Sequence, residues 1–291
     1  MRRRAVIVAG GVGLFAAGSL GLGLVEAGTL PGRILLHTAL GLTGPDGKVP
    51  EAAPGRRVTR TFRSRAMGGV DVRWSLAYPP GAGEEAELPV VVFLHGRHEN
   101  HRYGFDALGL DRFLASAAEH AGASFTVVTV DGGRDTYWHR RRGGADPEAM
   151  LWDELLPKLA ARGLKVNQVG LYGFSMGGYG ALLFAARRPE RVSAVVAVAP
   201  AIWRAYAETA AGAFDGPSDF RAHNVYRRRG ALRNLPLRID CGHDDPFAPN
   251  VKSFVSGLPT RPAGGFQPGT HTIGYLRRMA PAHLRFFAKH L

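Results

Sequence analysis

Ser175 lies in a short segment whose residue types and spacing could support nucleophilic chemistry. The segment Gly173-Phe174-Ser175-Met176-Gly177 stands between a short apolar run and a long helical run rich in alanine and leucine. This order is typical of a nucleophile elbow, a tight strand-turn-helix connection that lifts a serine hydroxyl clear of a sheet. A Cβ at Gly173 or Gly177 would crowd the turn, so glycine suits both positions. The pattern predicts Ser175 as a nucleophile, with a helix-capping serine loop as the structural alternative.

A nucleophilic serine needs a base that takes its proton and a carboxylate that orients this base and balances its charge. On sheets with a nucleophile elbow, the chain order is serine, acid, histidine. After the apolar run that ends at Cys241, the sequence has two adjacent candidates for the acid, Asp244 and Asp245. Near the C terminus, the glycine-rich residues 264–271 end in His271. We therefore predict a mobile loop that carries His271 as the general base.

Histidine and tryptophan side chains in other loops are candidates for a metal site or for a substrate pocket. His95, His98 and His101 are spaced at three residues, which could suit a metal ion. No cysteine or carboxylate in a rigid element completes a ligand set there, so no metal is expected. His95 could instead line a substrate pocket together with Trp138 and Trp203, and simple packing is the alternative for these aromatic side chains.

The segments around these candidates alternate between unbroken apolar runs and helical patterns. Such strands, apolar on both faces, predict a mostly parallel sheet with helices on both faces and a ligand site beyond the carboxyl ends of its strands. An alternating pattern ahead of them predicts an antiparallel hairpin at the leading edge of this α/β protein. The expected hairpin covers residues 58–65 and 70–78. The expected strands after it are 89–95, 125–130, the run before Ser175, 192–199 and 235–241. Helices are expected near 106–120, 147–161, after Ser175, and over 273–290, where Pro281 should kink or divide the helix.

The chain divides into an N-terminal extension and one large domain. Residues 1–27 begin with three arginines and continue with a long uncharged run, as in a signal peptide or an N-terminal membrane anchor. Residues 28–57 are rich in turn residues and are predicted to be a linker that partly packs on the domain. The catalytic domain is expected over residues 58–291, with a cap inserted at 200–234. This organisation predicts export, with the domain outside the cell or anchored to its membrane.

The composition is that of a globular protein with a strong basic surplus. The 291 residues carry a formal net charge of +13, with 45% hydrophobic and 21% charged residues. Basic residues are scattered, and no helix-turn-helix, zinc or RNA-binding pattern accompanies them, so no nucleic-acid partner is expected. An arginine bias of composition or a basic surface facing anionic lipid or cell-wall polymer could explain the charge.

The string G-F-S-M-G-G-Y-G-A around Ser175 resembles the putative-esterase branch of the α/β-hydrolases, which contains esterase D (S-formylglutathione hydrolase) and the antigen 85 mycolyltransferases. The resemblance covers about residues 88–290. It implies an α/β-hydrolase fold with a short cap. The family's G-x-x-D-P spacing favours Asp245 over Asp244 as the acid. The resemblance of His95-Gly96 to the family's oxyanion loop implies that the backbone N–H groups of Arg97 and Met176 form an oxyanion hole.

These features together predict a serine esterase that uses no cofactor. The expected substrate is a small-molecule or lipid ester of a carboxylic acid, cleaved through an acyl-enzyme. One alternative is acyl transfer of the antigen 85 type, although that subgroup uses glutamate as its acid. Another is a catalytically silent binding module on the cell surface. Acyl length, alcohol moiety and oligomeric state do not follow from the sequence.

Overall fold

The computed structural model describes residues 33–291 of the chain, which divides into two compact units, Met1–Gly44 and Pro45–Leu291. The described part of the first unit contains helix α2 (Arg33–Ala39), whose Leu35 side chain is exposed. No helix within residues 33–291 is long and apolar enough to cross a membrane. The predicted signal peptide or anchor, residues 1–27, lies outside the described residues.

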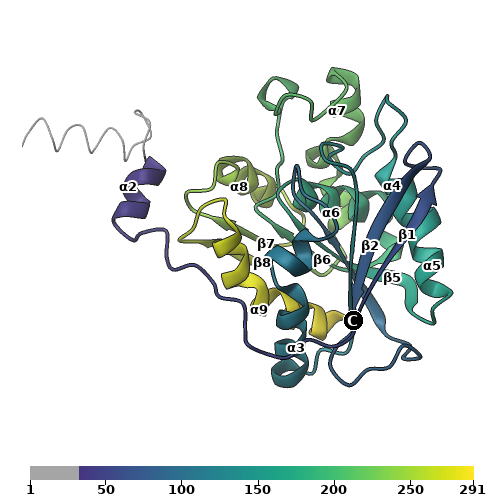
Figure 1. Cartoon of the computed structure of the whole chain (residues 1–291). Coiled ribbons are helices and arrows are strands. Elements are labelled where there is room, and N and C mark those ends of the chain that lie inside the picture. Colours follow the sequence, from purple (N-terminus) through teal and green to yellow (C-terminus); the bar gives the residue numbers. More distant parts are fainter. Residues whose placement is uncertain (1–32) are drawn as a thin grey trace, which may run out of the picture. The chain divides into compact units, whose positions relative to one another are not determined.

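The second unit is built on an eight-stranded sheet (Figure 1). Across the sheet, the strands follow the order β1-β2-β4-β3-β5-β6-β7-β8. Strand β2 runs antiparallel to both β1 and β4, and all the other neighbours are parallel. The predicted fold class is thereby confirmed. The strands are β1 (Arg57–Ser64), β2 (Val70–Ala77), β3 (Pro89–Leu94), β4 (Thr126–Val130), β5 (Lys165–Phe174), β6 (Val192–Val198), β7 (Leu237–Gly242) and β8 (Ala263–Gln267).

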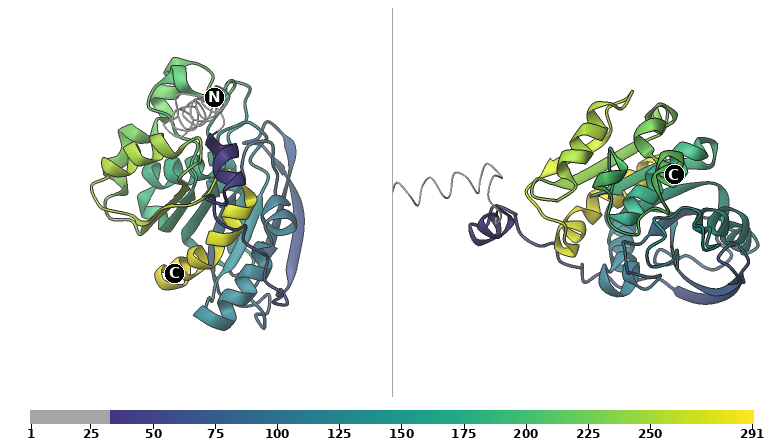
Figure 2. Two further views of the ribbon diagram at one scale, coloured as in Figure 1. Left: turned by 90° about the vertical axis from the view of Figure 1, so that its left-hand side faces the viewer. Right: turned by 90° about the horizontal axis from the view of Figure 1, so that it is seen from above.

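Helices cover both faces of this sheet. A Cβ on Gly170 of β5 would contact Phe287 of α9, whereas one on Gly173 would contact the backbone of α6. Because residues 170 and 173 point to opposite faces of a strand, α9 and α6 lie on opposite sides. Helix α9 packs beside α3 (Figure 2). The helices of this unit are α3 (Leu110–Ala121), α4 (Pro147–Ala149), α5 (Leu156–Ala160), α6 (Met176–Arg187), α7 (Pro217–His223), α8 (Ala248–Ser256) and α9 (Ile273–His290), with the short helical turns η1 (Tyr103–Ala107), η2 (Met150–Leu155), η3 (Pro189–Arg191), η4 (Tyr206–Glu208) and η5 (Val225–Leu232).

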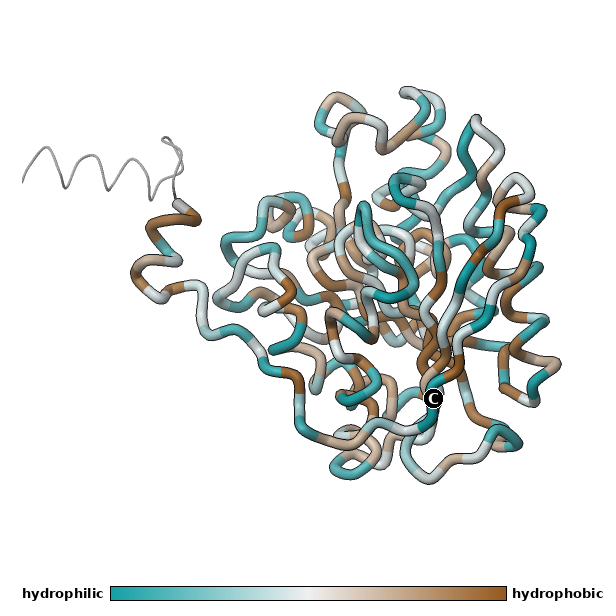
Figure 3. Tube along the Cα trace, in the orientation of Figure 1, coloured by the Kyte–Doolittle hydropathy of each residue, from teal (hydrophilic) through white to brown (hydrophobic). Residues whose placement is uncertain are grey.

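The hydrophobic core lies on the central strands, which are the brown stretches in the middle of Figure 3. The residues of β3 that follow Pro89 are all buried, as the unbroken apolar pattern predicts. The alternating pattern of β2 buries Val72, Trp74 and Leu76, while Val70 at its start is 51% exposed. The alternation in β2 ends at Trp74, because Ser75 and Ala77 are buried as well.

Two expectations about the C-terminal region are wrong. Residues 263–267 form strand β8, paired with β7, where we expected only a mobile loop. Pro281 does not divide the helix either, because α9 continues from Ile273 to His290. Leu276 and Leu284, on either side of this proline, are fully buried and hold both halves of the helix on the core.

Two segments of the predicted organisation have definite places in the second unit. Residues 45–56, in the predicted linker, belong to it: the N–H of Gly47 donates to the carbonyl of Gly274 at 2.8 Å. The predicted cap, residues 200–234, contains η4, α7 and η5 between β6 and β7. Helix α7 of this segment lies at the top of Figure 1.

Candidate active site

Ser175 occupies the turn between β5 and α6. Its backbone has φ 57° and ψ −117°, a conformation that is strained for a residue with a Cβ. The close packing of the turn explains the neighbouring glycines. A Cβ on Gly173 would lie 2.0 Å from the Gly177 carbonyl oxygen, and one on Gly177 would lie 1.8 Å from that of Leu94. The N–H of Ser175 donates to the Val198 carbonyl at 3.0 Å, which ties the turn to β6.

The structure brings together three side chains that are far apart in the chain. His271 Nε2 lies 2.9 Å from the Ser175 hydroxyl oxygen. The other ring nitrogen, Nδ1, lies 2.7 Å from Oδ2 of Asp245. An imidazole that donates from Nδ1 to a carboxylate presents an unprotonated Nε2 to the serine hydroxyl. The arrangement can therefore accept a proton from Ser175 and hold the resulting positive charge next to a carboxylate.

Of the two adjacent aspartates, it is Asp245 that contacts His271. Its side chain is fully buried. Its Oδ1 accepts a hydrogen bond from the Phe247 N–H at 2.8 Å, which leaves Oδ2 directed at the imidazole. The backbone N–H of Asp244 instead donates to the Gly269 carbonyl at 3.0 Å. The buried carboxylate is thus fixed by the turn that starts α8.

The loops after β7 and β8 are held together by the continuation of their parallel pairing. The His243 N–H donates to the Gln267 carbonyl at 2.8 Å, next to the Asp244 bond to Gly269. A Cβ on Gly242 would lie 2.3 Å from the Gly269 carbonyl oxygen, so the two loops lie backbone to backbone. This contact sets the distance between the acid on one loop and His271 on the other.

Two aromatic rings that we did not predict pack on His271. Phe174 stacks on the imidazole with ring centroids 4.7 Å apart, and Phe247 meets it edge-on at 5.4 Å. The His271 side chain remains 25% exposed. The sequence did contain a signal for both phenylalanines, because each stands within two residues of a predicted site residue. The rings restrict the orientation of the imidazole while its Nε2 faces Ser175.

The loop after β3 passes directly beside the elbow. A Cβ on Gly96 would lie 3.7 Å from the Cβ of Ser175. The Arg97 guanidinium donates to Asp135 at 2.6 Å and to the Ala211 carbonyl at 3.1 Å, which anchors this loop to two others. Met176 is the first residue of α6, so its N–H has no acceptor within the helix. The two predicted oxyanion donors thus belong to segments that flank Ser175.

His95 and Trp138 were predicted as pocket residues, but the structure buries both side chains almost completely. His95 Nε2 accepts from the Gly132 N–H at 3.1 Å, so Nδ1 carries the proton and donates to the Gly96 carbonyl at 2.8 Å. Burial lowers the pKa of His95 to about 4. Trp138 Nε1 donates to the carbonyl of His95 at 3.1 Å. Both residues therefore brace the loops behind the site rather than form a wall that a substrate could reach.

Trp203, the third predicted pocket residue, belongs to an aromatic cluster that joins the cap to neighbouring loops. Its ring lies 5.4 Å from Tyr137, 6.2 Å from Phe214 and 5.7 Å from Phe247 between centroids. It is only 6% exposed. Since Phe247 also contacts His271, Trp203 is separated from the imidazole by a single ring.

The three evenly spaced histidines do not converge on one point. His95 has the backbone contacts described above, and His98 Nε2 lies 3.0 Å from Asp135. His101 Nδ1 lies 2.9 Å from Asp131, whose Oδ1 also accepts the His101 N–H. Each ring thus has its own partner in a different direction.

Solved structures with this fold include several esterases. A ferulic acid esterase matches with a TM-score of 0.71 and 19% identity over 82% of this chain and 100% of its own. The S-formylglutathione hydrolase of Agrobacterium tumefaciens matches with a TM-score of 0.68 and 18% identity over 83% and 98% of the two chains. MPT51 (FbpC1) of Mycobacterium tuberculosis matches with a TM-score of 0.64 and 18% identity over 81% and 99%.

At these identities the structural matches establish a shared fold. No curated protein matches the chain in sequence. Residues 64–256, more than half of the chain, match the family described as "Putative esterase". The chain therefore belongs to the putative esterase family of the α/β-hydrolases, and it is a carboxylic ester hydrolase.

Proposed function

We propose that this chain hydrolyses carboxylic esters by nucleophilic catalysis, with Ser175, His271 and Asp245 as a catalytic triad. The observation that carries the proposal is the pair of side-chain contacts at His271, 2.9 Å to Ser175 and 2.7 Å to Asp245. A serine hydroxyl is a weak nucleophile unless a base removes its proton during attack. His271 Nε2 is within reach for that transfer, and Asp245 fixes the required tautomer.

Attack of Ser175 on the ester carbonyl forms a tetrahedral intermediate whose oxygen becomes negatively charged. The backbone N–H groups of Met176 and Arg97 donate to this oxygen. Loss of one such donor typically costs about 3 kcal/mol of transition-state stabilisation. His271 then gives its proton to the departing alcohol, and Ser175 keeps the acyl group as an ester.

Water completes the reaction through the same histidine. His271 removes a proton from a water molecule that attacks the acyl-enzyme, and the acid is released as Ser175 regains its proton. The substrate that we propose is a small-molecule or lipid ester. The aromatic cluster around Trp203 and Phe247, one ring away from His271, favours esters with an apolar acyl group.

We also propose that the enzyme acts outside the cytoplasm. Met1-Arg2-Arg3-Arg4 and the uncharged run over residues 5–25 support export or anchoring. The net charge of +13 supports association with anionic lipid or cell-wall polymer.

The proposal is tested with p-nitrophenyl esters of increasing acyl length. Wild-type protein should hydrolyse at least part of the series, and Ser175→Ala should lose about 10⁴-fold or more in kcat while folding normally. Ser256→Ala is the matched control, because the hydroxyl of this exposed serine at the end of α8 donates to the Ser253 carbonyl of its own helix. Analysis of products with an added sugar acceptor separates hydrolysis from acyl transfer. Full activity of Ser175→Ala would refute the proposed nucleophile.

A further inference from the structure

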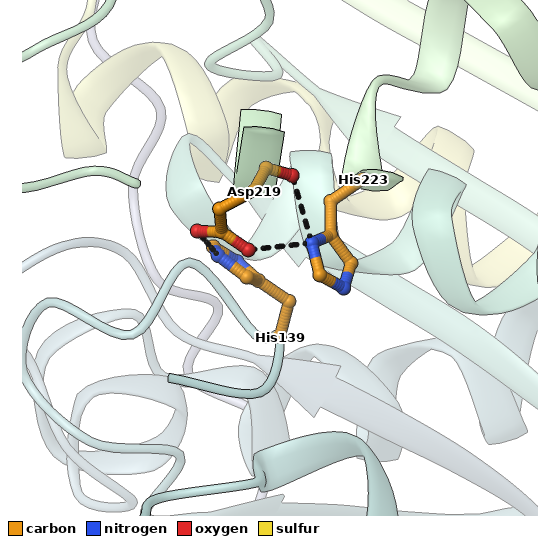
Figure 4. Close-up of side chains that lie close together, drawn as sticks. All are labelled: His139, Asp219 and His223. Atoms are coloured by element: carbon orange, nitrogen blue, oxygen red, sulfur yellow. Dashed lines mark hydrogen bonds and ion pairs between the residues drawn. The ribbon is translucent and has the colours of Figure 1, made fainter. Parts of the chain in front are cut away.

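A second cluster of chemically active side chains, made of His139, Asp219 and His223, joins the cap to the loop after β4 (Figure 4). One ligand atom from each of the three lies within 4.8 Å of the others. His139 Nε2 is 3.1 Å from Asp219 Oδ2, and His223 Nδ1 is 2.9 Å from Asp219 Oδ1. His223 Nδ1 also lies 3.0 Å from the backbone carbonyl oxygen of Asp219, so without an ion this nitrogen carries a proton and donates to Asp219. The two imidazoles thus approach the two oxygens of one carboxylate, and binding of an ion would displace the proton from His223 Nδ1.

The cluster joins two segments that are far apart in the chain. His139 belongs to the loop after β4, 80 residues before Asp219. Asp219 and His223 lie on α7, where the four-residue spacing puts both on the same side of the helix. Their side chains are only 16% and 13% exposed, and that of His139 is completely buried. The three groups therefore form a nearly closed site instead of a solvated surface cluster.

Both ring nitrogens of His139 face hydrogen-bond acceptors, although a neutral imidazole has an N–H for only one of them. Nδ1 lies 3.2 Å from the Tyr137 carbonyl oxygen, while Nε2 faces Asp219. Both partners are hydrogen-bond acceptors, and a neutral imidazole has a single N–H. If Nδ1 donates to the carbonyl, the lone pair of Nε2 points at the carboxylate. A metal-binding histidine typically has this arrangement, with its other N–H held by a backbone carbonyl.

Protonation of both His139 and His223 to imidazolium ions would give every ring nitrogen an N–H, but it would be electrostatically unfavourable. The rings of His139 and His223 are only 4.4 Å apart between centroids, so two imidazolium ions would repel each other. A single divalent cation could instead bind neutral imidazole nitrogens and the Asp219 carboxylate at the same time.

We infer that His139, Asp219 and His223 bind a divalent transition-metal ion, best matched by Zn²⁺. Two imidazoles and one carboxylate are a typical zinc ligand set. With Zn–N and Zn–O bonds of about 2.0–2.2 Å, ligand atoms in a tetrahedral site lie roughly 3.3 Å apart. The observed contacts join different oxygens of the carboxylate, 3.1 Å from His139 Nε2 to Oδ2 and 2.9 Å from His223 Nδ1 to Oδ1. Each imidazole would therefore exchange a hydrogen bond to Asp219 for a bond to the ion. Small side-chain rotations would admit the ion, with water at the fourth position.

The bound ion fastens the cap to the catalytic domain next to the triad. The Tyr179 hydroxyl donates to the His223 carbonyl at 2.8 Å, and the Tyr179 N–H donates to the Ser175 carbonyl at 3.0 Å. His139 also stacks on Phe214 at 5.0 Å, within the aromatic cluster that includes Trp203. The ion stabilises the folded protein and the aromatic wall and takes no part in proton transfer at Ser175.

The test is a zinc titration of chelator-treated, tag-free full-length protein, followed by calorimetry and by metal analysis after dialysis. We expect one Zn²⁺ per chain and a Tm increase of roughly 5–10 °C at 100-fold excess over Kd. Bound Co²⁺ should give visible d–d absorption typical of a site with low coordination number. Failure of folded wild-type protein to bind either ion would overturn the inference.

Variants locate the ion. His223→Gln and Asp219→Asn should each weaken binding by about 100-fold or more and remove the rise in Tm, and circular dichroism checks that each variant folds. His120→Gln is the matched control, because His120 is 70% exposed on α3. Equal binding by wild type and both cluster variants would place the ion elsewhere and refute the site. None of these measurements uses ester turnover, so the result is independent of the triad.

Discussion

At the scale of single residues, glycine at position 177 is required by the close approach of two backbone segments. A Cβ there would lie 1.8 Å from the Leu94 carbonyl oxygen, so either the end of β3 or the start of α6 must move. We predict that Gly177→Ala lowers the free energy of unfolding by at least about 2 kcal/mol, measured by urea denaturation. Gly143→Ala is the control, because a Cβ on Gly143 meets no atom within 4 Å. Equal free energies of unfolding for the two variants would show that the elbow accommodates a Cβ at position 177.

The adjacent aspartates allow a matched pair of substitutions. Asp245 contacts His271 Nδ1 at 2.7 Å, whereas the backbone N–H of Asp244 donates to the Gly269 carbonyl at 3.0 Å. Asp245→Asn should lower kcat for a p-nitrophenyl ester by about 10⁴-fold, because the amide can favour the wrong imidazole tautomer. Asp244→Asn should change kcat by less than about tenfold. A larger loss for Asp244→Asn would reverse the assignment.

At the scale of helices, strands and loops, the sequence predicted those elements that have a strong local pattern. The runs of valine in β3 and β6 and the glycines at the elbow are visible without any tertiary contact. Strand β8 was missed because Ala263-Gly264-Gly265 has few apolar side chains and glycine normally weakens a strand. Gly264 has φ 87°, and a Cβ there would lie 2.5 Å from the Ile239 carbonyl oxygen. The need for glycine thus arises from pairing with β7, which one segment of sequence cannot reveal.

The cap is joined to the loop after β4 by an arginine as well as by the histidine cluster. The Arg141 guanidinium lies 2.9 Å from Asp215 and donates to the carbonyls of Gly212 and Asp135 at 2.9 and 2.7 Å. Arg141→Ala should therefore release the 209–216 segment and increase its cleavage rate several-fold in limited proteolysis. Exposed Arg140 provides the control variant. Unchanged cleavage in Arg141→Ala would mean that the aromatic packing and the histidine cluster hold the cap without Arg141.

At the scale of the whole molecule, the sites consist of residues that only the complete sheet brings together. Ser175 and His271 are 96 residues apart, and their meeting could be anticipated because the family resemblance gives the chain order of the triad. No comparable sequence pattern links His139 to Asp219, so their contact could not be predicted. The buried positions of His95 and Trp138 also depend on how neighbouring loops fold over one another. Local patterns therefore identified the triad candidates better than the pocket residues.

Buried histidines should make the stability of the whole domain depend on pH. Burial lowers the pKa of His95 from 6.5 to about 4 in the folded state. Burial likewise lowers the pKa of His283, against a hydrogen bond to Asp240 that raises it. As the pH falls, the unfolded chain takes up protons on these histidines at a higher pH than the folded chain does. The contribution of the neutral histidines to the free energy of unfolding is therefore fully present above pH 6.5 and is lost as the pH falls toward 4.

For His95 alone, the loss approaches about 1.4 kcal/mol per pH unit within this window. His95→Gln keeps an acceptor for the Gly132 N–H but cannot gain a proton. Urea denaturation between pH 7 and 4 should therefore show a shallower decline for this variant, and His120→Gln should follow the wild type. An unchanged slope for His95→Gln would mean that His95 is accessible to protons in the folded state.

The central claim, that Ser175 is activated by His271, is tested most directly by its reaction with a fluorophosphonate. Intact-protein mass spectrometry should show one adduct per chain, and peptide sequencing should place it on Ser175. His271→Ala should retain its fold and react far more slowly, while Ser175→Ala should not react. Rapid ester hydrolysis without an adduct on Ser175, or equally fast labelling of His271→Ala, would contradict the account.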